Sequence, residues 1–176
     1  MEFEKALILV SEFFHGERRP FLVIGAFALH AYGLTRATRD LDFAAEASVQ
    51  EKLIAYLSAC GYETLHRSAG YSNHLHSDPA LGRLDFVYVD GPTAEILFGS
   101  AHELLGPDGL RVPVPKAEHL AALKVHAIRN DPARAFRDLA DIQYLMELPG
   151  ADLDEIRGYF EKAGLREKYD ELRKLS

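Results

Sequence analysis

The chain has 176 residues and a mass of 19.7 kDa, which leaves room for one compact domain, or one domain with a helical appendage, and excludes two full catalytic domains. Its 48% hydrophobic and 27% charged residues indicate a globular protein with a buried core and exclude a disordered chain. A single cysteine, Cys60, excludes an internal disulfide. Because the sequence shows neither a secretion signal nor a long apolar run, we expect a cytoplasmic protein without membrane contact.

The formal net charge of −7 argues against general affinity for nucleic acid, which basic surface provides. The charge is uneven along the chain. Residues 116–176 hold 11 basic and 12 acidic side chains, whereas residues 1–115 hold 9 basic and 15 acidic side chains. If an RNA end is a substrate, we therefore expect the second half to receive it.

The first elements predict a strand, a glycine turn, a helix and a second strand. Apolar residues spaced three and four apart predict an amphipathic helix over 2–14, ended by Gly16. A short buried strand is predicted over 21–24, followed by a turn at Gly25. The next elements are a short helix over 26–32 and a strand over 40–45.

A helix over 49–59 is predicted by the capping box formed by Ser48 and Glu51, and it is expected to stop at Gly61. Cys60, in this Ala/Leu-rich stretch, is expected to be a buried structural thiol rather than a nucleophile. Alternating residues then predict strands over 62–66, 71–76 and 83–89, so that the sheet is mixed.

The second half is expected to be helical. A short edge strand over 110–114 tolerates Pro113, and helices are predicted over 116–128 and 132–148, with one or two more from Leu153 onward. The sequence thus predicts an α+β, or mixed α/β, fold with a mixed sheet flanked by helices over residues 1–115. Residues 116–176 are expected to form a helical region that packs on this core.

Three aspartates stand out on the predicted strands. Asp40 and Asp42 are two residues apart, which puts both carboxylates on one face of a strand. Asp85 lies in an otherwise apolar strand, where an unpaired charge is costly to bury. Oxygen ligands of this kind suit magnesium, although D-x-D pairs are also common on surfaces.

The residues before the aspartates favour a phosphate site over a plain surface. The turn Ile24-Gly25-Ala26 brings backbone N–H groups and a helix N-terminus close to where a triphosphate would bind. Arg36 and Arg39 are placed to meet phosphate or to pair with Asp40 and Asp42.

Further motifs follow these residues in a fixed order. In chain order they are Val23-Ile24-Gly25-Ala26-Phe27-Ala28, Tyr32-Gly33, Arg36-Ala37-Thr38-Arg39-Asp40-Leu41-Asp42, Asp85, and the helical set Lys124, Arg129, Asp138 and Asp141. This combination resembles the nucleotidyltransferase superfamily, most nearly its AbiEii/AbiGii toxin-like branch. The resemblance spans roughly residues 22–145, and the ordered set is more specific than any one motif.

The resemblance implies transfer of a nucleoside monophosphate from an NTP to an acceptor hydroxyl, with Mg²⁺ or Mn²⁺ as the cofactor. It implies catalytic roles for Asp40, Asp42, Asp85, Lys124 and Asp138, the first three also binding the metal. The implied nucleotide-binding residues are Gly25, Ala26, Arg36, Thr38, Arg39, Lys124 and Arg129. The acceptor stays open among an RNA end such as that of tRNA, a protein and a small molecule. Many relatives are toxins, which implies an antitoxin protein as a partner.

Two other functions remain open. Ala26 stands where relatives often carry Ser or Gly, so a hydroxyl contact to phosphate is absent, and the chain could be a catalytically weakened nucleotide-binding or interaction module of the same fold. The three aspartates could also serve metal-dependent phosphodiester hydrolysis, but the glycine turn favours transfer.

Several residues also have purely structural interpretations. Lys124 falls between Leu120 and Ile128, so we expect its ammonium to point toward the first half, although it could be a snorkelling lysine. Surface ion pairs with Arg134 and Arg137 explain Asp138 and Asp141 almost as well as catalysis does. The pair His74 and His76 suits zinc poorly, because no further ligand follows at the required spacing.

Overall fold

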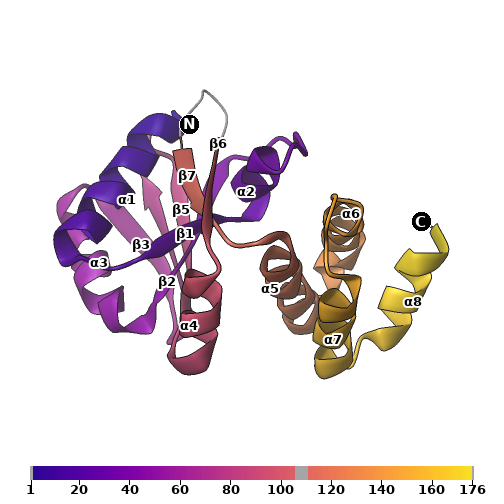
Figure 1. Cartoon of the computed structure of the whole chain (residues 1–176). Helices are drawn as coiled ribbons and strands as arrows, with labels where there is room; N and C mark the ends of the chain where they lie inside the picture. The colour runs from indigo at the N-terminus through magenta and orange to yellow at the C-terminus, as the bar shows by residue number, and fades with distance from the viewer. Residues whose placement is uncertain (1, 106–110, 176) are drawn as a thin grey trace. The chain divides into compact units, whose positions relative to one another are not determined.

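The computed structural model describes residues 2–105 and 111–175. The chain forms two compact units, Met1–Pro115 and Lys116–Ser176. In the described residues, the first unit holds a five-stranded mixed sheet with helices and a two-stranded sheet, and the second unit holds helices (Figure 1). The predicted mixed α/β fold class is therefore confirmed.

The five-stranded sheet has the order β1-β2-β5-β4-β3. Its strands are β1 (Phe21–Ile24), β2 (Asp40–Glu46), β3 (Tyr62–Arg67), β4 (Tyr71–His76) and β5 (Arg83–Val89). Only β2 and β5 run parallel, and the other neighbouring strands are antiparallel. The central β2–β5 pair is thus flanked on both sides, which buries its backbone.

One face of the sheet carries the core of the first unit. Phe43 on β2 and Phe86 on β5 are paired in register and stack with their ring centroids 5.0 Å apart. Helices α1 (Phe3–Glu17) and α3 (Gln50–Ala59) lie on one side of the sheet (Figure 1). The Phe14 ring of α1 stacks on Phe21 of β1 at 4.9 Å, so the aromatic side chains tie helix to sheet.

Helix α1 is longer than the sequence predicts. It continues through Gly16 to Glu17, and the next residue, Arg18, adopts the left-handed conformation with φ 53°. The backbone N–H of Arg18 bonds to the carbonyl of His15, and that of Arg19 bonds to the carbonyl of Phe14, so Arg18 takes the capping role expected of a glycine.

The predicted capping box is wrong, although the helix that it predicted is present. A short 3₁₀ turn, Ala47–Val49, precedes α3, and neither start is capped by a side chain. Ser48 instead donates a hydrogen bond to Glu46 at 3.2 Å, and Glu51 forms an ion pair with Arg67. Both side chains have more favourable partners outside the helix start.

Three elements complete the first unit. Helix α2 (Gly25–Ala31) follows β1 directly, whereas α4 (Gly91–Gly99) and β6 (His102–Leu105) were not predicted from the sequence. Strand β6 pairs with β7 (Arg111–Val114) in an antiparallel sheet. Leu110, included in the predicted edge strand, lies outside the described residues.

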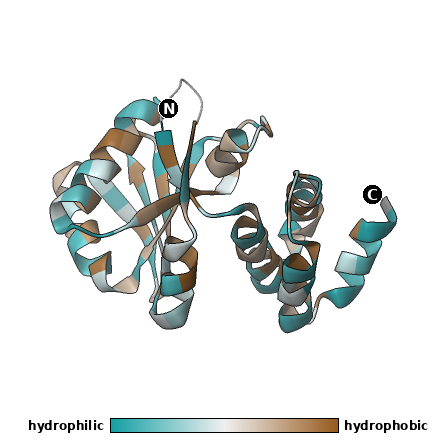
Figure 2. Ribbon diagram, viewed as in Figure 1, coloured by the Kyte–Doolittle hydropathy of each residue, from teal (hydrophilic) through white to brown (hydrophobic). Residues whose placement is uncertain are grey.

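The second unit consists of helices in the residues that the structure describes: α5 (Ala117–Asn130), α6 (Ala135–Met146), α7 (Leu153–Ala163) and α8 (Arg166–Leu175). The predicted helix over 132–148 begins as a 3₁₀ turn at Pro132 and ends at Met146. Asp152 caps α7 by accepting the N–H of Glu155 at 2.9 Å. Figure 2 shows α8 as mostly hydrophilic, with Tyr169 and Leu172 buried. None of the described helices has the length and apolar character needed to span a bilayer.

Candidate functional site

The turn from β1 into α2 presses directly against Asp42. Gly25 has φ +64°, and a β-carbon at this position would lie 2.0 Å from Oδ2 of Asp42. Both facts require glycine, because other residues rarely adopt this conformation and no side-chain atom fits the space. The backbone at the start of α2 therefore lies against a carboxylate of the predicted site.

Strand register brings Asp42 and Asp85 together. They are Cα partners on the parallel strands β2 and β5, so they lie about 4.8 Å apart in the sheet and leave the same face. Asp40 is on the same face two residues earlier in β2, about 7 Å along the strand. Because the neighbouring residues Leu41, Phe43, Leu84 and Phe86 are fully buried on the opposite face, the aspartates define an acidic face.

Three residues of the acidic face were not predicted to belong to it: Arg83, Tyr71 and Asn73. Arg83 donates a hydrogen bond from Nε to Oδ1 of Asp85 at 2.9 Å and lies 3.5 Å from the Tyr71 hydroxyl through Nη2. Burial, and next the charge of Asp85, raises the pKa of Tyr71. The first contact lies within β5 and the second joins β5 to β4, and the alternation in these strands was the sequence signal for both.

Asn73 is the Cα partner of Asp85 on β4, so its side chain leaves the same face. Its Oδ1 is buried and has no hydrogen-bond partner among the described residues. An unpaired buried carbonyl oxygen is costly. This oxygen, on the strand next to Asp85, therefore fits a ligand that brings a cation or a hydrogen-bond donor.

The donor set on the acidic face fits a magnesium ion held together with phosphates. Among the residues that the structure describes, no three His, Cys, Asp or Glu side chains are gathered into a group able to hold a metal by themselves. Magnesium, however, is usually bound by one or two carboxylates together with water and substrate phosphates. The neighbouring pair Asp42 and Asp85 meets that requirement, with Asp40 adjacent on the same face.

The loop before β2 is tied down by short polar contacts. The Thr38 hydroxyl donates to the carbonyl of Asp40 at 3.1 Å, and Nε2 of His30 lies 2.8 Å from the backbone N of Arg36. Arg36 is half-buried, whereas Arg39 is exposed. Thr38 thus acts on the backbone of the loop.

Ala26, the departure from the family pattern, is buried with 1% of its surface exposed. Its methyl group therefore belongs to the packing of α2, and only its backbone could meet a phosphate. This arrangement keeps the predicted backbone role and leaves no side-chain role at position 26.

Lys124 is held by two carboxylates within the second unit. Its Nζ lies 2.6 Å from Oδ2 of Asp141 and 3.3 Å from Oδ1 of Asp138, both on α6. All three residues are buried, with 6%, 3% and 0% of their surfaces exposed for Lys124, Asp141 and Asp138. The structure thus excludes the solvent-exposed lysine and shows an ammonium that is paired with two carboxylates inside the helical unit.

The predicted surface ion pairs on α6 form only in part. Arg134 pairs with Asp138 at 3.0 Å, and Arg137 also approaches Asp138, at 3.9 Å. Asp141 is instead bound by Lys124. Arg129, near the end of α5, is exposed. A catalytic role for Asp138 and a nucleotide-binding role for Arg129 stay predictions.

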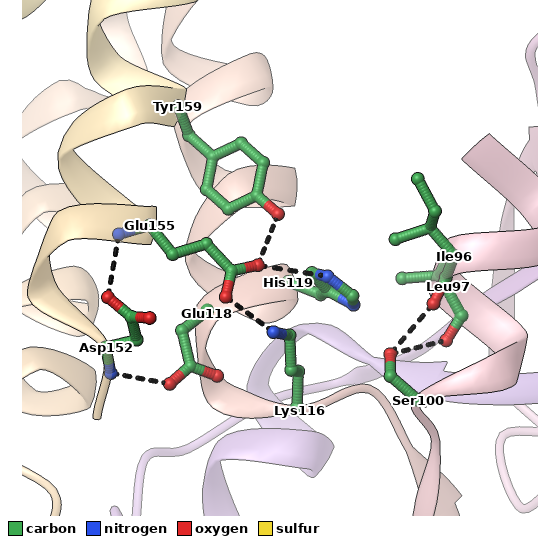
Figure 3. Close-up of polar contacts among 9 residues, drawn as sticks. All are labelled: Ile96, Leu97, Ser100, Lys116, Glu118, His119, Asp152, Glu155 and Tyr159. Atoms are coloured by element: carbon green, nitrogen blue, oxygen red, sulfur yellow. Dashed lines mark hydrogen bonds and ion pairs between the residues drawn. The ribbon is translucent and has the colours of Figure 1, made fainter. Parts of the chain in front are cut away.

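A second polar network ties the start of α5 to α7 (Figure 3). Glu155 accepts hydrogen bonds from Lys116 at 2.5 Å and from the Tyr159 hydroxyl at 2.7 Å, and its Oε1 lies 3.3 Å from Nε2 of His119. Burial acts to raise the pKa of Glu155, but the bonds from Lys116 and Tyr159 outweigh it and hold the pKa below its usual value. Burial, and next the charge of Lys116, lowers the pKa of His119. The network stabilises the helical unit.

The two histidines weighed as zinc ligands have separate structural roles. His74 is fully buried. Its Nδ1 lies 3.0 Å from the Thr64 hydroxyl, and its Nε2 lies 2.8 Å from the Ser72 hydroxyl. Burial lowers the pKa of His74 to about 4. His76 contacts the backbone at Cys60 and Asp78. Cys60 itself is a free thiol that is partly exposed rather than buried as predicted.

Solved structures share this fold at low sequence identity. The solution structure of the antibiotic-resistance factor ANT(2'')-Ia matches with a TM-score of 0.68 and 16% identity, over 98% of this chain and 97% of that one. Its crystal structure in complex with adenylyl-2''-tobramycin gives a TM-score of 0.64 at 16% identity, over 95% and 96%. The lincosamide antibiotic adenylyltransferase LnuA, bound to lincomycin, gives 0.55 at 17% identity, over 82% and 96%.

No curated protein sequence matches the chain, so family membership rests on the family comparison. The family described as nucleotidyl transferase AbiEii toxin, type IV TA system, matches residues 8–175. This match takes in both units and every predicted site residue. The chain therefore belongs to the AbiEii nucleotidyl transferase family and is a nucleotidyltransferase enzyme.

Proposed function

We propose that the protein transfers a nucleoside monophosphate from an NTP to an acceptor hydroxyl, with Asp42 and Asp85 at the centre of the reaction. The observation that carries this proposal is the contact of Gly25 with Asp42 beside the register pair Asp42–Asp85. It supports a backbone cradle for phosphate directly against carboxylates, which is what a nucleotide–metal complex requires.

In this reaction the acceptor oxygen forms a bond to the α-phosphorus while the bond from the α-phosphorus to the bridging oxygen breaks and pyrophosphate leaves in line. Asp85 accepts the proton of the attacking hydroxyl. Backbone N–H groups at Gly25 and Ala26 orient the phosphates, and Arg36 and Arg39 offset their charge. Thr38 keeps the loop that carries both arginines in place through its bond to Asp40.

A divalent cation, Mg²⁺ or Mn²⁺, would be held by Asp40, Asp42 and Asp85 and would supply charge neutralisation at the reacting phosphates. The remaining proposed residues belong to the helical unit. Lys124 and Arg129 would offset the charge of the triphosphate, and Asp138 would support Lys124 through their contact at 3.3 Å.

The family supports a toxin role with an antitoxin protein as partner. Fold neighbours that adenylylate antibiotics support a small-molecule acceptor, whereas an RNA end or a protein suits a toxin. We therefore propose a transferase whose acceptor is a small molecule, an RNA end or a protein. The net charge of −7 makes a polyanionic acceptor less favourable than a neutral or cationic one.

The experiment is incubation of the protein with each α-labelled NTP and Mg²⁺, together with separate pools of RNA, protein and small hydroxyl compounds, antibiotics included. We expect one of these pools to become labelled. The rate of labelling should be at least about 100-fold lower with Asp42→Asn, because the variant loses transition-state stabilisation. Asp154→Asn is the matched control, since its side chain is 82% exposed and pairs with Arg157 at the surface.

Two results would point elsewhere. Nucleotide binding without labelled product in any pool would favour the weakened binding module. Cleavage of RNA that is sensitive to Asp42→Asn, without transfer of label, would favour phosphodiester hydrolysis.

A further inference from the structure

The ion pair between Arg83 and Asp85 is an unassigned feature at the centre of the acidic face. Arg83 is the Cα partner of Asp40 across the β2–β5 pair, so it shares the face of the aspartates. Its Nε donates to Oδ1 of Asp85 at 2.9 Å, and the side chains of Arg83 and Asp85 are 38% and 12% exposed. A largely buried carboxylate is thus bound by a more exposed guanidinium.

This contact fixes the direction of the Asp85 carboxylate. A guanidinium is planar and donates along set directions, so the bond to Oδ1 restricts the orientation of the Asp85 carboxylate. Tyr71 restricts the guanidinium from the other side, with its hydroxyl 3.5 Å from Nη2 of Arg83. Asp85 is consequently held between its register partner Asp42 and the side chains from β4.

Resting on the proposed function, we propose that Arg83 is a positioning residue that holds Asp85 in the single orientation needed by the nucleotide–metal complex and the acceptor hydroxyl. Outer-shell partners of this kind typically contribute 10- to 100-fold to metal affinity or activity. Arg83 acts through Asp85 and touches neither the reacting phosphate nor the acceptor.

Two other roles for Arg83 predict different results. If Arg83 merely occupied Asp85 in competition with the cation, its removal would strengthen metal binding. If Arg83 bound the triphosphate itself, its removal would weaken nucleotide binding whether or not Asp85 was present. The direction of the change and its dependence on Asp85 therefore separate the three roles.

The test is a titration of Mn²⁺ into the full chain, followed by electron paramagnetic resonance, with the α,β-methylene analogue of each NTP present in turn. We expect Arg83→Gln to weaken Mn²⁺ binding by about 10- to 100-fold. Arg83→Lys should recover part of the loss, because an ammonium restores charge but not the fixed donor geometry. Arg67→Gln is the matched control, since Arg67 is 45% exposed and pairs with Glu51.

The same titration in an Asp85→Asn background decides whether Arg83 acts through Asp85. We expect Arg83→Gln to change Mn²⁺ binding there by less than about 2-fold, since the group it orients has been altered. A full additional loss in this background, or binding as tight as or tighter than wild type in the single variant, would overturn the proposal.

Failure of the proposed function would look different. If the unmodified protein bound no Mn²⁺–nucleotide complex and labelled no acceptor, the transferase proposal and the role of Arg83 would fall together. If the unmodified protein bound the Mn²⁺–nucleotide complex and labelled an acceptor, and Arg83→Gln did both equally well, only the role of Arg83 would fall. Thermal unfolding checks the fold of each variant, because a partly exposed pair contributes little to stability.

Discussion

Gly25 is the residue on which the geometry of the acidic face depends most directly. We expect Gly25→Ala to reduce nucleotide transfer by at least about 100-fold, because a group displaced by about 1 Å can cost that much. The added β-carbon would lie 2.0 Å from Oδ2 of Asp42, so the carboxylate or the turn must move. The left-handed conformation at φ +64° adds strain of about 1–2 kcal/mol for alanine. Labelled transfer and thermal unfolding measure the two effects.

Gly99→Ala is the matched control for this substitution. Gly99 ends α4, and nothing lies within 4 Å of a β-carbon built there, so activity and stability should stay close to those of the unmodified chain. Full activity of Gly25→Ala would show that Asp42 can move without loss, and the proposed catalytic geometry would be wrong.

At the residue scale, the sequence predicted the aspartates but not their surroundings. Asp40 and Asp42 follow from strand alternation, and Asp85 from a charge in an apolar strand. Arg83 lies two residues before Asp85, so alternation puts it on the same face, but its register with Asp40 and that of Asn73 with Asp85 could not be predicted. Register is a tertiary property, set by packing across strands that are distant in sequence.

At the scale of elements, the buried ion group between α5 and α6 makes a prediction about stability. We expect Lys124→Met to destabilise the helical unit by about 3–5 kcal/mol, because it removes the ammonium that is bound between two buried carboxylates. Lys124 lies 2.6 Å from Asp141 and 3.3 Å from Asp138. Urea unfolding followed by circular dichroism measures the change.

Arg137→Gln is the control for Lys124→Met, since it removes a cation that is 54% exposed and 3.9 Å from Asp138. A loss below about 1 kcal/mol is expected for such a pair. If Lys124→Met unfolded like the unmodified chain and lost only transfer, Lys124 would be a functional group without a structural role.

Three strands were predicted with both bounds correct. The strands over 21–24, 71–76 and 83–89 match β1, β4 and β5, because short buried runs and alternating runs of this length are typical of strands. Helix α4 was not predicted, since Gly91 and Pro92 are residue types typical of turns, although proline is favoured in the first turn of a helix. The capping box failed because Ser48 and Glu51 found partners outside the helix start.

At the scale of the whole molecule, the chain divides at Pro115, where β7 ends and the helices begin. The β2–β5 pair sets the face that holds the aspartates, and the helical unit holds Lys124. That the first unit is the catalytic core stays a prediction, and Lys124, Arg129 and Asp138 of the helical unit are proposed to take part in the reaction. The stability of the first unit, however, depends on a group away from that face, the buried imidazole of His74.

The stability of the protein should fall as the pH drops from about 6.5 toward 4, because of His74. Burial lowers its pKa from 6.5 to about 4 in the folded chain. As the pH falls through that range, the unfolded chain takes up a proton that the folded chain does not, so the free energy of unfolding decreases. The full effect is on the order of 3 kcal/mol. Replacing the imidazole, in His74→Gln, should flatten the pH dependence of the free energy of unfolding, which urea denaturation at each pH measures. His126→Gln is the control, since His126 is exposed and should leave the curve unchanged. Parallel curves for His74→Gln and the unmodified protein would show that His74 does not resist protonation in the folded state.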